Sequence, residues 1–474
     1  MTTTAAAQPA VMVRKINGER FTPLSLAKKL GAIALLESAS FQRGRERYSF
    51  LLLREAFRVL QKGDELFMVR DGATLALRTK AGGDILDVLA HFSRQHDGRT
   101  EQFPLPTGGI GFLSYEYCRR FDTIKLRDRP DPLGLPDAIF LFGSVFLVFD
   151  HYTDTISIVG LNYREKEIDI ARALDETERR INDLDFNFMA PARTDWVVEP
   201  LPREDDRETY LWGVNAVKEQ IVQGNLLQGV LSRRMQVRTD MPAIEAYRAL
   251  RTGNPSPYMF YLDFGDFQLF GASPEVHVKV RDGTAAIRPL AGTRRRGADA
   301  AEDARREQEL LSDPKERAEH LMLVDLARND LGRVCAPGTV TVTQLMDVER
   351  YSHVMHIVSH VEGTLAPGRT GLDALRATFP AGTVSGAPKI RAIEIIDALE
   401  PVRRGFYAGV VAHVESDGSL DSCISIRCAL KQGDIVTLQA GAGVVYDSVP
   451  EKEFEETEAK LGALARALGM EARK

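Results

Sequence analysis

The hydrophobic pattern of the chain alternates between strand-like and helix-like segments. The run "IFLFGSVFLVFDHYTDTISIVG" predicts two strands joined by a polar turn. The next segment, "EIDIARALDETERRINDL", has apolar positions at helical spacing and predicts a helix. Strand-like runs recur later, among them "PYMFYLDF", "FQLFGAS", "EVHVKV" and "IVTLQAGAGVVY", often adjacent to one another as in hairpins. We therefore predict a large α+β fold that is rich in antiparallel sheet.

Composition divides the chain into two regions. Residues 1–10 resemble a flexible tail, and residues 189–206, "MAPARTDWVVEPLPREDD", are rich in proline and charge as linkers are. We predict an N-terminal region over residues 11–188 and a second region over residues 205–470, with sheets shared between the two. Just past the boundary, "RETYLWGVNAVKEQIVQG" predicts an amphipathic helix that stops at Gly224, and "LLQGVLSRRMQV" predicts a strand.

Bulk composition argues against several functional classes. The 474 residues are 44% hydrophobic and 27% charged, as in folded rather than disordered proteins. A formal net charge of -6 without a long basic block argues against nucleic-acid binding. The longest apolar run is too short to cross a membrane, and no secretory signal is evident, so we expect a cytoplasmic protein. No CxxC pair occurs, so we expect buried, reduced thiols at the four cysteines, Cys118, Cys335, Cys423 and Cys428.

The stretch "DPKERAEHLMLVDLARND" places carboxylates on an apolar helical stripe. Asp313 is suited to cap the helix before a proline, and Glu316 can close a capping box. Glu319 lies one turn further along, on the face that also carries Leu323 and Leu326. A carboxylate at such a position needs a cation or a hydrogen-bond partner.

A second acidic helix is predicted near the C-terminus, in "VPEKEFEETEAKLGALARAL". Glu453, Glu456 and Lys460 share one face of it at spacings of three and four. Alone, this pattern is explained by an acidic first turn and an i,i+4 salt bridge between Glu456 and Lys460. Two such helices in one chain indicate instead that their carboxylates meet around one hard cation. Oxygen ligands without a histidine or cysteine cluster favour Mg²⁺, completed by an anionic substrate.

Small residues and an arginine complete the candidate chemistry. In "LQAGAGVVYDSVPEKE", the backbone of Gly441, Ala442 and Gly443 would approach an anion closely, although a tight turn also explains the run. In "SCISIRCAL", Arg427 is predicted on a strand, facing either a cavity or solvent, and could bind a carboxylate. Tyr407 of "RRGFYAGVV" is a candidate donor. Together these features indicate a small polyanionic substrate bound with a metal ion.

These segments together resemble the chorismate-utilising enzymes, most closely the large subunits of anthranilate synthase. Over about residues 205–465 the matching segments are, in order, "GASPE", "RPLAGT", "KERAEHLMLVDLARNDLGRV", "HVMHIVSHVEG", "FPAGTVSGAPKIRAIEIID", "GFYAG", "ISIRCAL" and "GAGVVYDSVPEKEFEETEAK". Residues 22–150 match more weakly, through "LLES", "RYSF" and "GGIGFLSYE". The resemblance implies a large antiparallel-rich β-sandwich flanked by helices, in agreement with the hydrophobic pattern.

The resemblance also implies a role for each candidate residue. Glu275 of "GASPE" would be the general acid and His356 a catalytic neighbour, although a satisfied core histidine is the alternative for His356. The implied Mg²⁺ ligands are Glu319 and Glu456, supported by Glu316 and Glu453. The groups implied to hold the carboxylates of chorismate are Gly292, Thr293, Tyr407, Arg427, Lys460 and the backbone of Gly441, Ala442 and Gly443. Thr293 is also implied to be a catalytic residue.

The chemistry implied by the resemblance needs these residue types. Expelling the C4 hydroxyl of chorismate while a nucleophile enters at C2 requires a proton donor, and a glutamic acid with a raised pKa can serve. A metal ion and an arginine that hold the carboxylates orient the ring. Later removal of the C2 proton expels pyruvate and aromatises the ring, with either Glu275 or His356 handling that proton.

Two positions distinguish the members of this family. Relatives that add water at C2 have a lysine base where this chain has Gln228, and aminodeoxychorismate synthases have a nucleophilic lysine where it has Ala291. Both differences favour ammonia as the nucleophile and anthranilate and pyruvate as the products of a lyase. The enzyme alternatives are aminodeoxychorismate synthase component I and an isochorismate or salicylate synthase. The non-enzyme alternative is an inactive tryptophan-sensing subunit.

No cysteine lies in a glycine-rich nucleophile elbow, so we expect ammonia from solution or from a glutamine amidotransferase subunit, component II. The segments "LLES" and "NPSPYM" resemble the tryptophan-binding segments of feedback-inhibited relatives, although core packing and a proline-rich turn also explain them. Glu37 would pair with the amino group of tryptophan. The residues implied to complete that regulatory site are Ser38, Pro257, Tyr258 and Met259.

Overall fold

Two long strands, β3 (Tyr48–Lys62) and β7 (Ala138–Asp150), pair antiparallel along most of their length, and two arms of the sheet extend from this pair. The computed structural model describes residues 10–39, 47–79, 82–96, 103–187, 193, 195–203, 206–350 and 354–470. Nearly every residue of β7 is buried, because both faces of this strand are covered. A polar turn follows β7 and leads to β8 (Thr155–Leu161), as the hydrophobic pattern predicts.

One arm of the sheet runs from β3 into the second half of the chain. Its strands, each paired antiparallel with the next, are β2 (Ala34–Glu37), β11 (Tyr258–Asp263), β12 (Gln268–Ser273), β21 (Cys428–Gln432), β22 (Ile435–Val444) and β10 (Gln228–Thr239). The short strands β9 (Val198–Pro200) and β18 (Gly386–Ala387) pair with β10. On the side of β7 that faces away from β3, β8 pairs with β7 and with β1 (Val11–Asn17).

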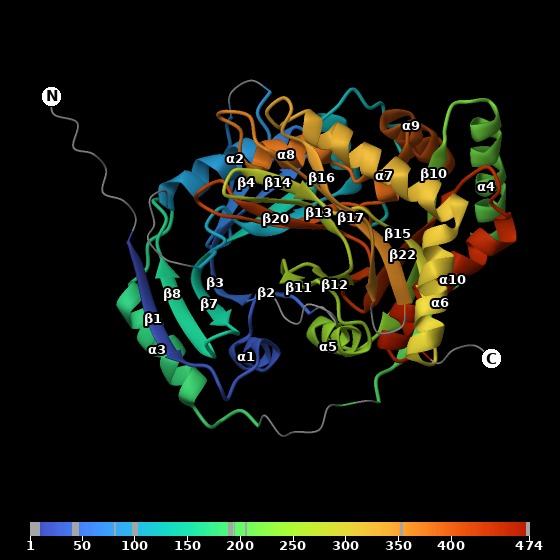
Figure 1. The fold of residues 1–474 in the computed structure, drawn as a ribbon. Helices are drawn as coiled ribbons and strands as arrows, with labels where there is room; N and C mark the ends of the chain where they lie inside the picture. The colour runs from blue at the N-terminus through green and yellow to red at the C-terminus, as the bar shows by residue number, and fades with distance from the viewer. Residues whose placement is uncertain are drawn as a thin grey trace.

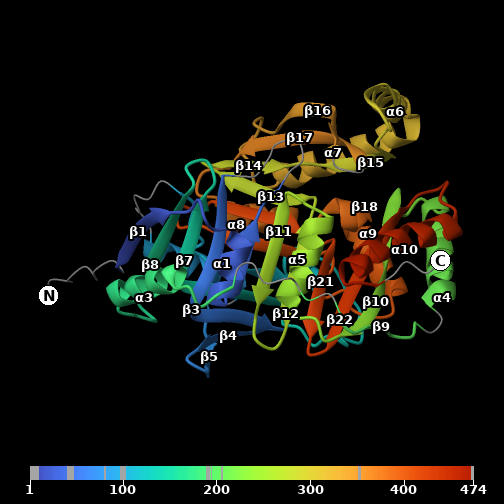
Figure 2. The ribbon, with the colours of Figure 1, turned by 90° about the horizontal axis from the view of Figure 1, so that it is seen from below.

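A second arm leaves from β7. It consists of β6 (Ile110–Leu113), β19 (Val410–Val414), β20 (Leu420–Ile424), β13 (Val276–Arg281), β14 (Thr284–Ile287) and β17 (Val354–Thr364), and β17 also pairs with β15 (Leu290–Arg295) and β16 (Thr341–Arg350). The hairpin of β4 (Glu65–Arg70) and β5 (Ala73–Leu77) extends from β3. Figure 2 shows β14 to β17 gathered with α6 and α7 at one side of the molecule.

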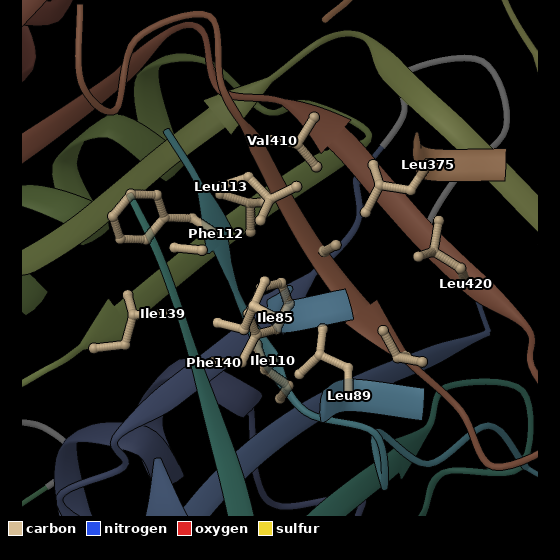
Figure 3. Packing of buried hydrophobic residues seen from close by; sticks show 14 of the residues in the cluster. Ile85, Leu89, Ile110, Phe112, Leu113, Ile139, Phe140, Leu375, Val410 and Leu420 are labelled. Atoms are coloured by element: carbon tan, nitrogen blue, oxygen red, sulfur yellow. The ribbon is translucent and has the colours of Figure 1, made fainter. Parts of the chain in front are cut away.

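The two arms share one hydrophobic core. Phe112 and Val410 of the second arm belong to the same buried cluster as Phe260 and Leu269 of the first. Figure 3 shows side chains of this cluster from distant parts of the chain, including Ile85, Leu89, Ile110, Phe140, Leu375, Val410 and Leu420. The core therefore mixes residues from both regions that composition predicts, while the division itself, near residues 189–206, stays a prediction.

Helices cover the outside of the sheet, with α7 and α8 at the top of the view in Figure 1 and α1 and α5 at the bottom. The helices are α1 (Pro23–Leu30), α2 (Ile85–Ser93), α3 (Ile170–Asn182), α4 (Asp206–Val222), α5 (Ala243–Gly253), α6 (Ala300–Ser312), α7 (Pro314–Gly332), α8 (Gly371–Thr378), α9 (Lys389–Leu399) and α10 (Pro450–Ala467). The described residues also contain three short 3₁₀ helices, η1 (Arg94–His96), η2 (Tyr115–Arg120) and η3 (Gly382–Val384).

The structure confirms the predicted fold class, an α+β fold with a large antiparallel sheet. The predicted helix before Gly224 is α4, and Gly224 adopts a left-handed φ of 78° just beyond it. All four cysteines are buried thiols, as predicted. In the described part of the chain, no helix is long and apolar enough to cross a membrane.

Candidate active site

The first acidic helix, α7, begins where the sequence predicts. The Asp313 carboxylate caps it by accepting hydrogen bonds from the backbone N–H groups of Lys315, at 2.9 Å, and Glu316, at 3.3 Å. The capping box that Glu316 could close does not account for its side chain, which accepts a hydrogen bond from Arg294 of β15 at 2.8 Å. An arginine on the neighbouring strand can offer a charge-assisted hydrogen bond, which outweighs a bond to a neutral N–H group.

Glu319 projects from α7 toward β10, the last strand of the first arm. Its Oε1 accepts a hydrogen bond from the Gln228 amide at 3.1 Å. Burial raises the pKa of Glu319, and the nearby charges of Glu316 and Glu456 raise it further. The Gln228 side chain is only 5% exposed, and its Oε1 has no hydrogen-bond partner among the described residues.

The second acidic helix, α10, brings its glutamates to the same place. Lys460 donates to Glu456 at 2.7 Å, which is the i,i+4 salt bridge of the simpler explanation for this helix, and also to the Gly441 carbonyl at 2.7 Å. Burial raises the pKa of Glu453, and the charge of Glu456 adds to that shift. Among the described residues, no three His, Cys, Asp or Glu side chains already form a ligand set for an ion. The helices thus bring together carboxylates that disfavour one another's charged forms.

The run Gly441 to Gly443 lies inside β22, so the tight turn that would also explain it is wrong. A Cβ at Gly441 would lie 2.7 Å from the Leu231 carbonyl oxygen of β10 and 2.9 Å from the Tyr407 hydroxyl, and one at Gly443 would lie 2.6 Å from the Gln228 amide nitrogen. These contacts are closer than a Cβ allows. Small residues are needed here because the backbone of β10 and polar side chains from other segments reach the strand at these points.

Arg427 does not lie on a strand, in contrast to the prediction. The segment between β20 and β21 crosses from the second arm of the sheet to the first, and Arg427 adopts a left-handed φ of 51° at that crossing. Its carbonyl accepts a hydrogen bond from the N–H of Ala272 at 3.0 Å. Burial lowers the pKa of Arg427, while Tyr407 and Glu456 oppose that shift. The electrostatic interaction between Arg427 and Glu456 indicates that the guanidinium lies at the same site as the glutamates.

Glu275 immediately precedes β13 and is 8% exposed. Burial raises the pKa of its carboxyl from the ordinary 4.5 to about 8, against smaller opposing effects of Thr383 and Lys460. The Thr383 hydroxyl is buried and has no hydrogen bond of good geometry among the described residues. Thr383 was missed at the sequence level, where "GTVSGAP" signals only a turn of small residues.

His356 faces β15 across the β15–β17 pairing, opposite Thr293. Its Nδ1 lies 3.0 Å from both the Gly292 carbonyl and the Thr293 hydroxyl. Because a carbonyl can only accept, this geometry places the hydrogen of the neutral ring on Nδ1 and leaves the lone pair on Nε2. Burial lowers the pKa of His356, so the ring is neutral at physiological pH. Gly292 itself requires a left-handed φ of 66°.

A second cavity, of about 670 Å³, lies between the predicted tryptophan segments. Strands β2 and β11 pair so that Met259 lies opposite Glu37, which brings "LLES" and "NPSPYM" together. The predicted residues that line the cavity are Glu37, Ser38, Pro257, Tyr258 and Met259. The structure thus joins two segments that are more than two hundred residues apart in sequence.

The charges of this second cavity are already paired. The Glu37 carboxylate, 2% exposed, accepts hydrogen bonds from the Tyr247 hydroxyl at 2.7 Å and from Arg251 at 2.8 and 3.0 Å. Asp421, which the sequence did not single out, accepts from Tyr258 at 2.9 Å and pairs with Lys279 at 2.9 Å. A ligand amino group at Glu37 would therefore compete with Arg251.

Comparison with known proteins places these sites in a family context. The chorismate binding enzyme family matches residues 55–466. Anthranilate synthase component 1 of Spirochaeta aurantia is 61% identical over 462 residues, covering 97% of this chain and 96% of that protein. The protein of the same name from Aquifex aeolicus is 41% identical over 458 residues, covering 94% and 92%.

Solved structures agree with this similarity. The crystal structure of anthranilate synthase component I from Streptococcus pneumoniae has a TM-score of 0.77 and 34% identity, covering 89% of this chain and 92% of that one. A menaquinone-specific isochorismate synthase from Escherichia coli has a TM-score of 0.74 at 21% identity, covering 98% and 96%, and shows the fold alone.

Proposed function

Because this chain belongs to the chorismate-binding enzyme family, within its anthranilate synthase component 1 group, we propose that its site converts chorismate and ammonia to anthranilate and pyruvate. The observation that carries this proposal is the buried Glu275 carboxyl beside Thr383. With a pKa of about 8, Glu275 is mostly protonated at neutral pH. It can therefore give a proton to the C4 oxygen as that oxygen leaves.

The nucleophile is inferred from two uncharged side chains. Gln228 lies beside Glu319 and cannot deprotonate water, whereas ammonia needs no base to attack C2. Its Oε1, which lacks a partner among the described residues, is suited to accept an N–H of ammonia. Ala291 on β15 carries no nucleophile. His356, with its lone pair on Nε2, and Glu275 are the two candidates for removing the C2 proton.

We propose that Glu319 and Glu456 hold Mg²⁺, with Glu316 and Glu453 in support. The donor set is all oxygen, and the raised pKa values of Glu319 and Glu453 come from burial together with neighbouring negative charge, both of which a dication would offset. When bound, the ion would supply a positive charge to orient the ring carboxylate of chorismate. Glu456 would exchange its bond with Lys460 for the metal.

The chain's own residues then hold the remaining carboxylate. Arg427 and Lys460 offer charged donors, and the Tyr407 hydroxyl lies against Gly441 of β22. The backbone of Gly441, Ala442 and Gly443, with Gly292 and Thr293 opposite, would line the substrate. Burial of Arg427 and Tyr407 strengthens their attraction for an anion, because little water competes there.

The ammonia is proposed to come from a component 2 glutamine amidotransferase. The four cysteines of this chain are buried, and burial raises the pKa of the Cys118, Cys335 and Cys428 thiols, so none is suited to attack glutamine. Unpaired thiols also fit a cytoplasmic location, which is part of this proposal.

Feedback inhibition by tryptophan is proposed at the second cavity. Ser38 and Tyr258 supply polar edges and Pro257 and Met259 supply apolar contacts, which suits an amino acid with a flat ring. The amino group of tryptophan would compete with Arg251 for Glu37, or with Lys279 for Asp421. Tryptophan would inhibit by favouring a conformation that binds chorismate poorly.

The test of the proposed function is a fluorescence assay for anthranilate. The purified chain with chorismate, Mg²⁺ and ammonium should form anthranilate, and glutamine should replace ammonium only when the partner subunit is added. Aminodeoxychorismate, isochorismate or salicylate as the main product would overturn the assignment. Tryptophan binding without any turnover would favour the sensing subunit.

A further inference from the structure

Arg404 is a buried arginine, 2% exposed, in the segment that leads from α9 to Tyr407. Its Nε and Nη2 donate to the two carboxylate oxygens of Glu400, at 2.8 and 2.7 Å. Nη2 also donates to the Val230 carbonyl at 2.6 Å, and Nη1 donates to the Val384 carbonyl at 2.7 Å. One side chain therefore joins three separate segments of backbone.

Each of these segments carries a group of the proposed active site. Val384 belongs to η3, which also carries Thr383 beside Glu275. Val230 lies on β10, two residues beyond Gln228 and its bond to Glu319. The third segment is that of Arg404 itself, which carries Tyr407 three residues later.

The guanidinium is itself held in place from several sides. Its carbon lies 4.5 Å from the Tyr115 ring centre and 5.7 Å from that of Tyr407. Glu400 is fixed in turn by the backbone N–H and the hydroxyl of Ser232, at 2.8 and 2.9 Å. The Glu116 carboxylate accepts the backbone N–H groups of Arg404 and Gly405, at 2.6 and 3.1 Å. Moving the side chain would break several buried hydrogen bonds at once.

We propose that Arg404 is a positioning residue, whose guanidinium fixes Thr383, Gln228 and Tyr407 relative to one another around the substrate. The inference rests on the proposed function, because it takes Glu275 as the general acid. Only a planar fork can meet a carboxylate and two carbonyls in this way, since a lysine presents all its donors from one nitrogen.

The proposal has a consequence for Glu275 that a purely structural role would lack. When η3 is released, water reaches the Glu275 carboxyl and its pKa falls toward the ordinary value. The charged and titratable groups around Glu275 are Lys460 on α10, and His277 and Asp330, which line the small cavity beside it. These groups stay in place, so the direction of the change is set by hydration.

The experiment compares Arg404→Lys with Thr383→Val in the full chain, measured with chorismate, Mg²⁺ and ammonium. We expect Arg404→Lys to lower kcat by about 10²-fold, as a misplaced site does, and to move the basic limb of the pH profile to lower pH. Thr383→Val removes a hydroxyl that stabilises the Glu275 carboxylate, so it should move the same limb to higher pH.

Arg376→Lys is the matched control. Arg376 makes a two-bond contact with Asp84 between α8 and α2, at 2.5 and 2.9 Å, and its acidic partners among the described residues, Asp84 and Asp87, lie at the start of α2, outside the site. It should leave kcat and the pH profile unchanged. Tyr115→Leu, which removes a ring from the guanidinium, should shift the basic limb in the same direction as Arg404→Lys but less, and it serves if Arg404→Lys does not fold.

Hydrogen exchange separates this inference from the proposed function. Backbone amides 382–386 should exchange faster in Arg404→Lys or Tyr115→Leu than in Arg376→Lys, whatever reaction the wild-type chain catalyses. If wild type forms no anthranilate, the proposed function fails and this exchange result decides the positioning role. An unchanged pH profile and unchanged exchange in folded Arg404→Lys or Tyr115→Leu would overturn the inference.

Discussion

The candidate active site and the second cavity handle charge in opposite ways. At the candidate active site, burial raises the pKa values of Glu319 and Glu453, and the charges of neighbouring carboxylates raise them further. At the second cavity, Glu37 is paired with Arg251 and Asp421 with Lys279. The excess negative charge at the active site suits it to bind a cation and, with that cation, an anionic substrate. At the second cavity the charges are paired, so the shape of the cavity is the main basis for selecting a ligand.

The two cavities also share a wall. Val276 of β13 lines both of them, while the preceding Glu275 lines only the small cavity at the active site. The ladder between β13 and β20 is interrupted after Val276, and there the Ser422 hydroxyl donates to the Val278 carbonyl at 2.6 Å. A ligand in either cavity would press on the same strand, which gives the proposed inhibition a physical route.

The largest expected effect is at the crowded carboxylates. Glu319→Ala or Glu456→Ala should abolish turnover, because the proposed Mg²⁺ loses a ligand, while the metal-free protein unfolds at the same or a higher temperature since repulsion is relieved. Turnover at increasing Mg²⁺ and thermal unfolding are the measurements. The control is Glu451→Ala, at an exposed position on α10, the helix that carries Glu456. Near-normal activity of Glu319→Ala would sink the metal assignment.

A loss of about 10²–10⁴-fold is expected for Glu275→Gln, because the amide cannot give up a proton to the leaving oxygen. Chorismate binding, followed by calorimetry, should persist. Asp421→Asn removes a partly buried carboxylate at the other cavity, and it should retain most of the turnover while altering tryptophan binding. If both substitutions reduce turnover equally, the distinction between the cavities is wrong.

On the basic side of the pH profile, kcat/KM should fall by about tenfold per pH unit, because it depends on the protonated form of Glu275. Glu275 must be protonated to act, so kcat/KM should fall as the pH rises through about 8. The raised pKa also means that this carboxyl contributes stability below its ordinary value of 4.5, lost as the pH rises through about 8. Denaturant unfolding of wild type and Glu275→Gln at several pH values measures that loss. A rate that stays flat to pH 10 would contradict the assignment.

The smallest expected effect on catalysis is at the second cavity. Ser38→Phe should fill part of it and weaken tryptophan inhibition, with turnover in the absence of tryptophan close to wild type. Calorimetric titration of tryptophan and steady-state inhibition are measured on both proteins. The regulatory proposal fails if wild type binds no tryptophan at millimolar concentration, or if Ser38→Phe is inhibited as strongly as wild type.

Local spacing in the sequence determined much of this protein. The cap at Asp313 and the turn between β7 and β8 depend on residues a few positions apart, and both were predicted correctly. The Glu456–Lys460 salt bridge, which the sequence offered as the simpler explanation of the second acidic helix, also forms. Such features are readable because one helix turn or one hairpin fixes the neighbours of each residue. The motif residues Glu275, Thr293 and His356 were singled out by the family resemblance instead.

Only the tertiary structure decided the contacts between distant segments. Arg427 leaves its strand because the chain crosses between the two arms, and Gly441 must be small because Tyr407 reaches it from another segment. The positions of Thr383 and Arg404 likewise depend on how η3 and β10 meet. Sequence spacing contains no signal for these contacts, because the register of strands hundreds of residues apart is set by packing of the whole core.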